Sequence, residues 1–234
     1  MKLKRIAVDV MWGLLSIFLS GMIVQICSHD KQHVQSKSIS AYGGSTATKI
    51  SDDWIKYEFN DSYVLSVPDK MELRQDYDIY TRWLADGLGF ISSADAVFQQ
   101  KDLSSLTDKA KDTYARILMQ RYSTPIGEAD HYYESPLLTK EVCSDLNEIV
   151  EGEVKPGSFI DLPKWRVIDI SGVKAVEGSY RRTGFEGPVS CRFYLLSNYD
   201  EMVKIIVAYR EKDSDMWEED LSKVIYTFKW KNPK

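Results

Sequence analysis

Residues 189–210 read VSCRFYLLSNYDEMVKIIVAYR, and this stretch decides the fold. It contains two sets of alternating side chains: Val189, Cys191, Phe193 and Leu195, followed by Val203, Ile205, Val207 and Tyr209. Because successive side chains of a β-strand point to opposite faces, each set is expected on one face of a strand. The turn Asn198-Tyr199-Asp200 is of hairpin length, so residues 189–197 and 202–210 are predicted to pair antiparallel.

The sequence on either side of this hairpin extends the same architecture. Residues 165–170 and 173–182 are predicted as two further strands, joined by short polar connections. Beyond the hairpin, one helix face carries Trp217, Leu221, Val224, Ile225 and Phe228. Acidic residues crowd the first turns of that helix: Asp215, Glu218, Glu219 and Asp220. Negative charge there complements the helix dipole, which we favour over a cation site.

Three further strand regions are expected on the N-terminal side. Residues 54–59 and 63–67 are short β-prone runs around the turn cluster Asn60-Asp61-Ser62. Pro68 ends the second run because it has no N–H to donate. Residues 83–100 are predicted to form another strand pair, with a bend at Gly87-Leu88-Gly89.

Two helices are predicted in the middle of the chain. Helical spacing over residues 110–121, after a capping box at Ser105-x-x-Asp108, predicts the first. Ser135-Pro136 looks like an N-cap followed by a first-turn proline, and the second helix is predicted to end near Gly152. Its apolar stripe consists of Leu138, Val142, Leu146 and Ile149. We expect both stripes to face the core.

The predicted fold class is α+β, an antiparallel β-sheet packed with helices, preceded by an N-terminal transmembrane or signal helix. Residues 54–68 and 165–230 also resemble the PsbP-like/DcrB-like family. The resemblance rests on the opening strand–turn–strand that ends in Pro68, and on the hydrophobic pattern of the C-terminal strands and helix. It implies an α/β/α sandwich, found in extracytoplasmic accessory proteins and bacterial lipoproteins that usually lack enzymatic activity. Residues 70–160 depart from the family pattern in length and helix content.

The N-terminus predicts a membrane segment. Lys2, Lys4 and Arg5 precede the stretch 10–27, which is 18 residues long and uncharged. As a helix this stretch spans roughly 27 Å, close to the hydrocarbon thickness of a bilayer. Together with residues 6–8, membrane contact is expected over residues 6–27. The positive flank predicts a cytoplasmic N-terminus and an extracytoplasmic folded domain, in the periplasm or at the cell surface.

Three fates of residues 1–28 remain open. An uncleaved signal anchor fits the length and flanks best. A cleaved signal peptide would have a shorter apolar region and a small-residue cleavage site, and cleavage after Ser28 is the best one available. A lipoprotein would be acylated on Cys27, although the bulky Ile26 precedes it.

After this segment, residues 29–52 are expected to be a flexible tether, because they show no sustained period and contain Gly43-Gly44. Residues 53–234 are expected to form a single domain. Removing residues 1–28 leaves 27 basic and 34 acidic residues, a net charge of −7. This acidity argues against nucleic acid as a partner.

Catalytic motifs are scarce. His131 is the only histidine after residue 33, and the sequence has no P-loop, no nucleotide-binding glycine motif and no G-x-S-x-G elbow. A zinc-type site would need three or four ligands, and only Cys143 and Cys191 could accompany that histidine as soft ligands. We therefore predict no cofactor and no metal site. A hydrolase that uses His131 with an acidic partner is the alternative to a non-enzymatic protein.

Two surface features are candidate binding sites. Arg181 and Arg182, followed by Phe185, form a basic spot at a predicted hairpin tip. His131, Tyr132 and Tyr133 place aromatic side chains on a predicted loop, where they would suit an interface or cover a sheet edge. For both features an ordinary structural role competes with binding.

Cys143 and Cys191 are the only thiols beyond the apolar segment, and they could form one disulfide in an oxidising compartment. Burial of Cys191 as a small hydrophobic side chain is equally natural. Together these observations predict a non-enzymatic, membrane-tethered, extracytoplasmic binding or assembly module, with another extracytoplasmic protein as its expected partner.

Overall fold

A computed structural model describes residues 45–74, 94–123, 138–154, 158–184 and 186–233. All of them lie in the second of two compact units, Ala41–Lys234. Within these ranges no helix combines the length and the apolar character that crossing a membrane requires. The segment 6–27 lies outside the described residues, so its membrane role remains a prediction from the sequence.

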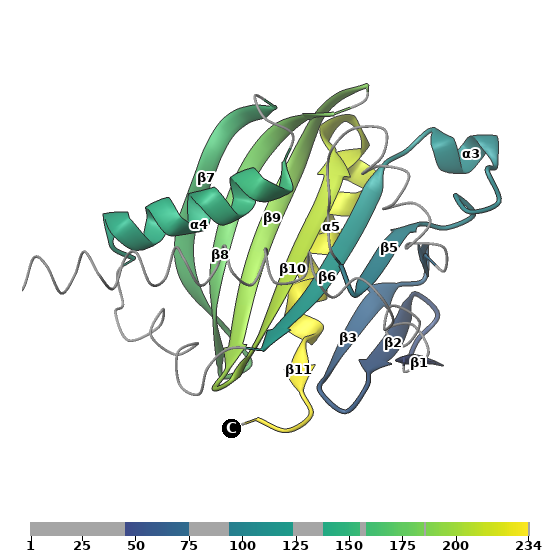
Figure 1. Ribbon diagram of the computed structural model, residues 1–234. Helices are drawn as coiled ribbons and strands as arrows, with labels where there is room; N and C mark the ends of the chain where they lie inside the picture. Colours follow the sequence, from purple (N-terminus) through teal and green to yellow (C-terminus); the bar gives the residue numbers. More distant parts are fainter. Residues whose placement is uncertain (1–44, 75–93, 124–137, 155–157, 185, 234) are drawn as a thin grey trace, which may run out of the picture. The chain divides into compact units, whose positions relative to one another are not determined.

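In the described residues, the larger sheet has seven antiparallel strands in the order β4-β5-β6-β10-β9-β8-β7 (Figure 1). The strands are β4 Met71–Leu73, β5 Ala96–Gln100, β6 Ala115–Ser123, β7 Phe159–Ile170, β8 Val173–Gly184, β9 Gly187–Asn198 and β10 Glu201–Arg210. The predicted hairpin is confirmed, with Ile206 opposite Phe193 in the β9–β10 register. Both strands lie inside the sheet, which explains their near-continuous burial.

The smaller sheet has the order β1-β2-β3-β11. Its strands are β1 Ser45–Lys49, β2 Trp54–Phe59, β3 Tyr63–Pro68 and β11 Lys229–Trp230. The predicted β2–β3 hairpin is confirmed, and Asn60 in its turn has a positive φ of 46°. The expected tether is corrected over Ser45–Lys49, because these residues pair antiparallel with β2. Thr and Ala alternate within this segment, which is compatible with an edge strand. The segment has no alternation of apolar and polar side chains, so its sequence did not predict a strand.

Helices cover both faces of the larger sheet. Alternate residues of β9 and β10 belong to two hydrophobic cores, with Phe193 and Ile206 in one and Tyr194 and Ile205 in the other. Helix α4 (Lys140–Glu153) packs on the first core and lies across β7, β8 and β9 (Figure 1). Helix α5 (Ser214–Val224) and the short η3 (Ile225–Thr227) contribute to the second core. The α+β class is therefore confirmed.

The second core also contains the smaller sheet. Tyr57, Leu65 and Val67 share it with the α5 residues Trp217 and Leu221. The layer on this face of the larger sheet is thus made of α5 together with four short strands. This differs from a layer of helices alone, which a simple α/β/α sandwich would have.

The first predicted middle helix is wrong over most of its length. Only α3 (Asp108–Lys111) is helical, with Thr107 rather than Ser105 as its N-cap. Residues 115–123 form β6 instead, between β5 and β10. Ala115, Ile117 and Met119 are fully buried and alternate with less buried residues, which is the period of a strand.

The second predicted helix is α4, and its stripe faces the core as expected. The helix begins after Thr139, whose side chain accepts a hydrogen bond from the Val142 backbone N–H at 3.3 Å. The proposed start at Ser135-Pro136 lies outside the described residues, as does the bend at 87–89. Cys143 on α4 and Cys191 on β9 are free thiols in the structure, and Cys191 is buried.

Candidate binding site

The two arginines of the predicted basic spot are consecutive residues of β8, and their side chains interact with different groups. Arg181 forms a bidentate ion pair with Glu211, with distances of 2.5 Å from Nε and 2.9 Å from Nη2. Its Nη1 is also 3.1 Å from the Asp161 carboxylate. These hydrogen bonds raise the pKa of Arg181 and lower the pKa of Glu211. The Arg181 charge is therefore already balanced within the protein.

Arg182 points to the other face of the sheet. Its Nη2 donates to the Tyr114 hydroxyl at 3.1 Å, and its Nη1 donates to the Thr183 carbonyl at 3.2 Å. Because neighbouring residues of a strand face opposite ways, the two arginines do not form one basic patch. Phe185, His131, Tyr132 and Tyr133 lie outside the described residues.

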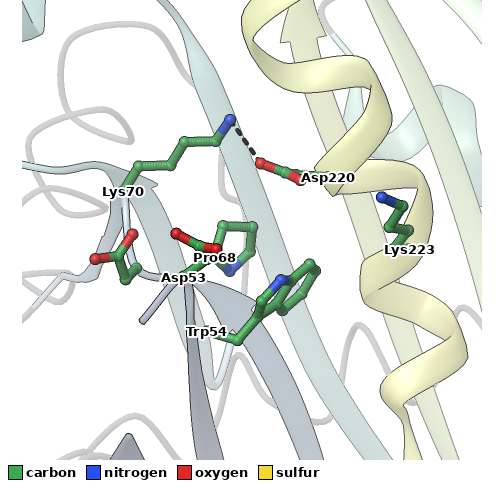
Figure 2. A pocket seen from close by; sticks show the side chains of 7 residues that line it. Asp53, Trp54, Pro68, Lys70, Asp220 and Lys223 are labelled. Atoms are coloured by element: carbon green, nitrogen blue, oxygen red, sulfur yellow. Dashed lines mark ion pairs between the residues drawn. The ribbon is translucent and has the colours of Figure 1, made fainter. Parts of the chain in front are cut away.

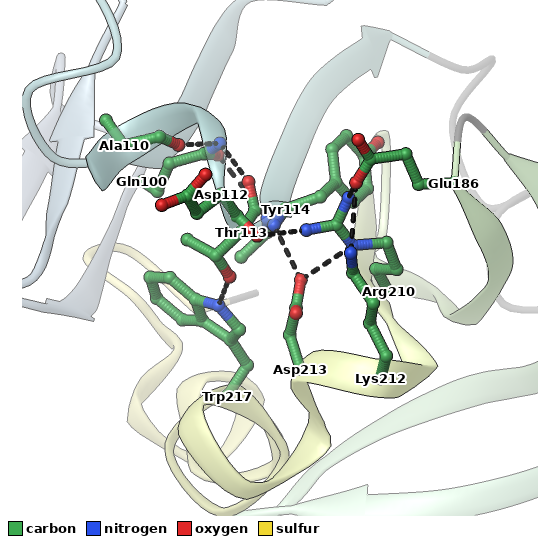
Figure 3. Close-up of polar contacts among 11 residues, drawn as sticks. Gln100, Ala110, Asp112, Thr113, Tyr114, Glu186, Arg210, Lys212, Asp213 and Trp217 are labelled. Atoms are coloured by element: carbon green, nitrogen blue, oxygen red, sulfur yellow. Dashed lines mark hydrogen bonds and ion pairs between the residues drawn. The ribbon is translucent and has the colours of Figure 1, made fainter. Parts of the chain in front are cut away.

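Arg210, at the end of β10, is the centre of a polar network that the sequence did not reveal (Figure 3). Only 3% of its side chain is exposed. Its Nε donates to Asp213 at 2.9 Å, and its two terminal nitrogens donate to the Glu186 carboxylate and the Asp112 carbonyl. Burial disfavours the charged form of Asp213, but hydrogen bonds from Arg210 and the Tyr114 backbone outweigh it and lower the pKa of Asp213.

The same network holds the loop before β6 against α5. The Gln100 amide donates to the carbonyls of Ala110 at 2.9 Å and Thr113 at 2.6 Å (Figure 3). The Trp217 indole N–H donates to the Thr113 hydroxyl at 2.7 Å. The Arg210 guanidinium, the Gln100 amide and the Trp217 indole N–H all donate to other groups of the protein, which makes the network structural.

A pocket of about 420 Å³ lies where the β2–β3 pair meets α5 (Figure 2). Its lining comes from two distant parts of the chain: Asp53, Trp54, Pro68, Asp69 and Lys70 on one side, and Asp220 and Lys223 on the other. The two sides are joined nearby, because the Ser66 backbone N–H donates to the Thr227 hydroxyl at 2.8 Å.

Lys70 is fixed at one side of this pocket. Its Nζ is 2.7 Å from the Asp220 carboxylate, donates to the Met216 carbonyl, and lies 4.8 Å from the centroid of the Trp217 ring. Asp220 therefore does more than complement the helix dipole, since it joins α5 to the β3–β4 turn. The sequence could not show this pairing, because Lys70 and Asp220 are 150 residues apart.

The other polar groups of the pocket wall differ in whether the described residues supply a partner. The carboxylates of Asp53 and Asp69 and the Trp54 indole N–H have no side-chain partner among the residues that the structure describes. Lys223 pairs with Glu219 at 2.6 Å on the exposed side of α5. The described residues contain no group of three or more His, Cys, Asp or Glu side chains suited to a metal ion. The pocket wall is therefore predominantly polar, and the carboxylates of Asp53 and Asp69 are hydrogen-bond acceptors within it.

No protein-family profile and no curated protein sequence matches this chain. The fold does match that of PsbP (CyanoP) from the cyanobacterium Synechocystis, with a TM-score of 0.51 and 12% identity. That match covers 79% of this chain and 97% of the cyanobacterial protein. The expected PsbP-like fold is thus confirmed.

Two further solved structures are similar at lower TM-scores. LpqN of Mycobacterium tuberculosis, a protein involved in cell envelope biogenesis, has a TM-score of 0.42 and 13% identity, with 80% of this chain and 90% of LpqN covered. PA94, a protein of unknown function from Pseudomonas aeruginosa described as a putative regulator, has a TM-score of 0.33 and 14% identity, with 79% and 96% covered. At these identities the likeness concerns the fold alone.

Proposed function

We propose that this protein is a membrane-tethered, extracytoplasmic accessory protein that binds a partner or ligand and catalyses no reaction. Two features support the location. Residues 10–27 are uncharged and follow three basic residues, as in a signal anchor. The remainder has a PsbP-like fold, and the resemblance noted from the sequence implies extracytoplasmic proteins of this kind.

The single observation that carries the proposal is the extent of the fold match. The similarity covers 79% of this chain and 97% of the cyanobacterial PsbP, so the one fold extends over most of this chain. The charged clusters around Arg181 and Arg210 are not assigned to binding, since their side chains are occupied in holding strands and loops together. The pocket beside α5 then provides the surface for a ligand.

A reporter fused after Lys234 tests the location. Fused alkaline phosphatase, which is active only after export, should be active in a bacterial host, and fused β-galactosidase should not. Deleting residues 1–28 should reverse both results. Phosphatase that is inactive in the full-length fusion, with active β-galactosidase, would overturn the proposal.

A second experiment addresses the accessory role. The full chain is cross-linked in intact cells, purified from solubilised membranes, and its cross-linked peptides are identified by mass spectrometry. We expect cross-links to one extracytoplasmic protein that lie on the described domain. Cross-links confined to cytoplasmic proteins would contradict the proposed role.

A further inference from the structure

The face of the larger sheet that packs against α5 is open to solvent over part of β7, β8 and β9. Helix α5 packs mainly against β10 and β3 (Figure 1). Ser179 is exposed although β8 lies inside the sheet, and its direct cross-strand partners are Lys164 and Arg192. Directly opposed residues share a face, so these three side chains form one row, the donor row. Arg192 lies near Glu218 of α5, which places the donor row on the α5 side.

The donor row has unused hydrogen-bonding capacity. Among the residues that the structure describes, the Lys164 ammonium and the Ser179 hydroxyl have no hydrogen bond or ion pair. Arg192 donates to the Tyr194 hydroxyl, but its Nη2 is 4.0 Å from the Glu218 carboxylate, which is beyond hydrogen-bonding distance. Neighbouring strands are about 4.8 Å apart, so the backbones of Lys164 and Arg192 are roughly 10 Å apart. Their long side chains can therefore reach one group that lies above Ser179.

The arginines on either side of the donor row are already paired within the protein. Arg166 Nε is 2.5 Å from the carboxylate of the buried Glu177. Arg181 Nε is 2.5 Å from the carboxylate of Glu211. In the described part of the chain, Glu218 is the one carboxylate within 4.0 Å of a cation of the donor row. The two cations of the donor row thus carry an excess of positive charge, which favours an anionic group as the ligand.

An exposed aromatic side chain lies beside the donor row. Tyr226 in η3 is 56% exposed. Hydrogen bonding to Glu177 raises the pKa of Arg166, and Tyr226 contributes to this shift, so its ring lies near that arginine. A small anion on an open face is hydrated and screened by salt, whereas a protein segment can contact the donors and the tyrosine together. These features favour a carboxylate that belongs to a protein segment.

We propose that the donor row is the docking surface for an acidic segment of a partner protein, whose carboxylate accepts hydrogen bonds from Lys164, Ser179 and Arg192. An apolar side chain of the segment packs on Tyr226, and the incoming carboxylate competes with Glu218 for the arginine. This inference rests on the proposed function, because it assigns a chemistry to the partner. Peptide binding is measured on purified protein, so it can fail while the export experiments succeed, and the reverse also holds.

The test uses the full chain purified in a polyoxyethylene detergent, which carries no charge. The probe is a pentapeptide with blocked ends that has glutamate at its second position, leucine at its fourth and glycine elsewhere. The control peptide has glutamine in place of the glutamate. Amide NMR spectra of the isotope-labelled protein report where each peptide binds, and a titration gives its affinity. We expect the glutamate peptide to shift signals of β7, β8 and β9, and to do so less at high salt. The glutamine peptide should leave these signals unchanged.

Matched variants locate the site. Lys164→Gln should weaken binding of the glutamate peptide about fivefold, and Lys164→Arg should retain it. Lys174→Gln removes an exposed cation from the opposite face of β8, so it should have no effect. Glu218→Gln should strengthen binding about twofold, because the competing carboxylate beside Arg192 is lost. Glu219→Gln changes the next carboxylate along α5, which pairs with a lysine of that helix, and should not strengthen binding.

The inference would be overturned by a glutamate peptide that does not bind, by equal binding of the glutamine peptide, or by equal affinities of Lys164→Gln and Lys174→Gln. It would also be overturned by a chain that sediments as a dimer and becomes monomeric in Lys164→Gln, because the face would then bind a second copy. Unchanged near-ultraviolet circular dichroism of Lys164→Gln and Glu218→Gln shows that both variants are folded, so their affinities report on the site.

Discussion

Arg210 brings a positive charge into the interior, and its hydrogen bonds join three segments that are far apart in the sequence. We predict that Arg210→Met lowers the free energy of unfolding by about 3 kcal/mol, because the partly buried Asp213 carboxylate keeps the Tyr114 N–H but loses the donor from Arg210, and the Asp112 carbonyl loses that donor as well. Urea unfolding followed by tryptophan fluorescence measures the change.

The matched control for Arg210 is Lys223→Ala. This variant removes the cation of an exposed pair on α5, so it should leave the urea midpoint unchanged. Equal midpoints for Arg210→Met and the wild type would mean that the network around Arg210 adds no stability.

Glu72 on β4 gives the protein a pH-dependent contribution to stability. Its carboxylate accepts hydrogen bonds from the Gln99 amide at 2.9 Å and from the backbone N–H groups of Asp102 at 3.0 Å and Ser104 at 2.9 Å. Partial burial raises the pKa of Glu72, but these hydrogen bonds outweigh it and the net shift is downward. A carboxyl group with a lowered pKa in the folded state stabilises the protein fully above its unfolded-state pKa. That contribution is lost as the pH falls through the folded-state pKa.

We therefore predict that Glu72→Gln destabilises the protein most near pH 7, and that its difference from the wild type shrinks towards pH 3. Urea unfolding of both proteins at pH 7, 5 and 3 measures this difference. A difference that stays constant across the three pH values would show that the Glu72 charge makes no contribution.

At the scale of elements, Gly178 and Trp165 lock β8 to β7. They are direct partners in the β7–β8 register, and a Cβ atom at position 178 would overlap the Trp165 ring. Trp165 is held there by a 2.8 Å hydrogen bond from its indole N–H to Asn147 on α4, and its ring meets Phe193 edge-on. The Trp165 side chain on β7 therefore contacts β8, β9 and α4.

We predict that Gly178→Ala destabilises the protein by about 1–3 kcal/mol, because the Trp165 ring must move out of its packed position. In a double-mutant cycle with Trp165→Ala, the second substitution should remove most of the cost of the first. Additive costs in the double variant would mean that the two residues do not interact in this way.

The elements that the sequence predicted well are those in which local pattern and tertiary position agree. The alternation in residues 189–210 matched strands inside a sheet, and the apolar face of the last helix matched α5. β6 was missed because Ile117 and Leu118 fit a helical stripe as well as a strand buried on both faces. In the structure Leu118 packs, partly buried, against the core on the α4 side, and Ile117 is buried in the core on the opposite side. Pairing of β6 with both β5 and β10 fixes these orientations, and the local sequence does not encode that pairing.

The candidate site could not be predicted for a similar reason. Trp54 was recognised as part of a strand, Pro68 as the residue that ends the next strand, and Asp220 as part of an acidic helix start. Their convergence depends on the packing of α5 against the smaller sheet, which no local pattern encodes. The predicted basic spot at Arg181 and Arg182 failed for the opposite reason. The two residues are neighbours in the sequence, but neighbours in a strand point to opposite faces, so their side chains do not meet.

At the scale of the whole molecule, the two hydrophobic cores consist of residues between Tyr57 and Trp230. We therefore expect deletion of residues 1–44 to leave the domain folded, with the same urea midpoint as the full chain in detergent. Cooperative unfolding and native-like near-ultraviolet circular dichroism would verify this. A truncated chain that unfolds without cooperativity would show that residues 1–44 contribute to the fold.

Deletion of residues 1–52 is the informative comparison, because it also removes β1. The Ser45–Lys49 strand pairs with β2 along five residues, from Ser45 opposite Phe59 to Lys49 opposite Ile55. Its loss exposes the β2 backbone to water and should lower the stability on the order of 1 kcal/mol relative to the shorter deletion. If both truncated chains have the same midpoint, β1 contributes nothing to the fold, and residues 45–52 belong to the tether after all.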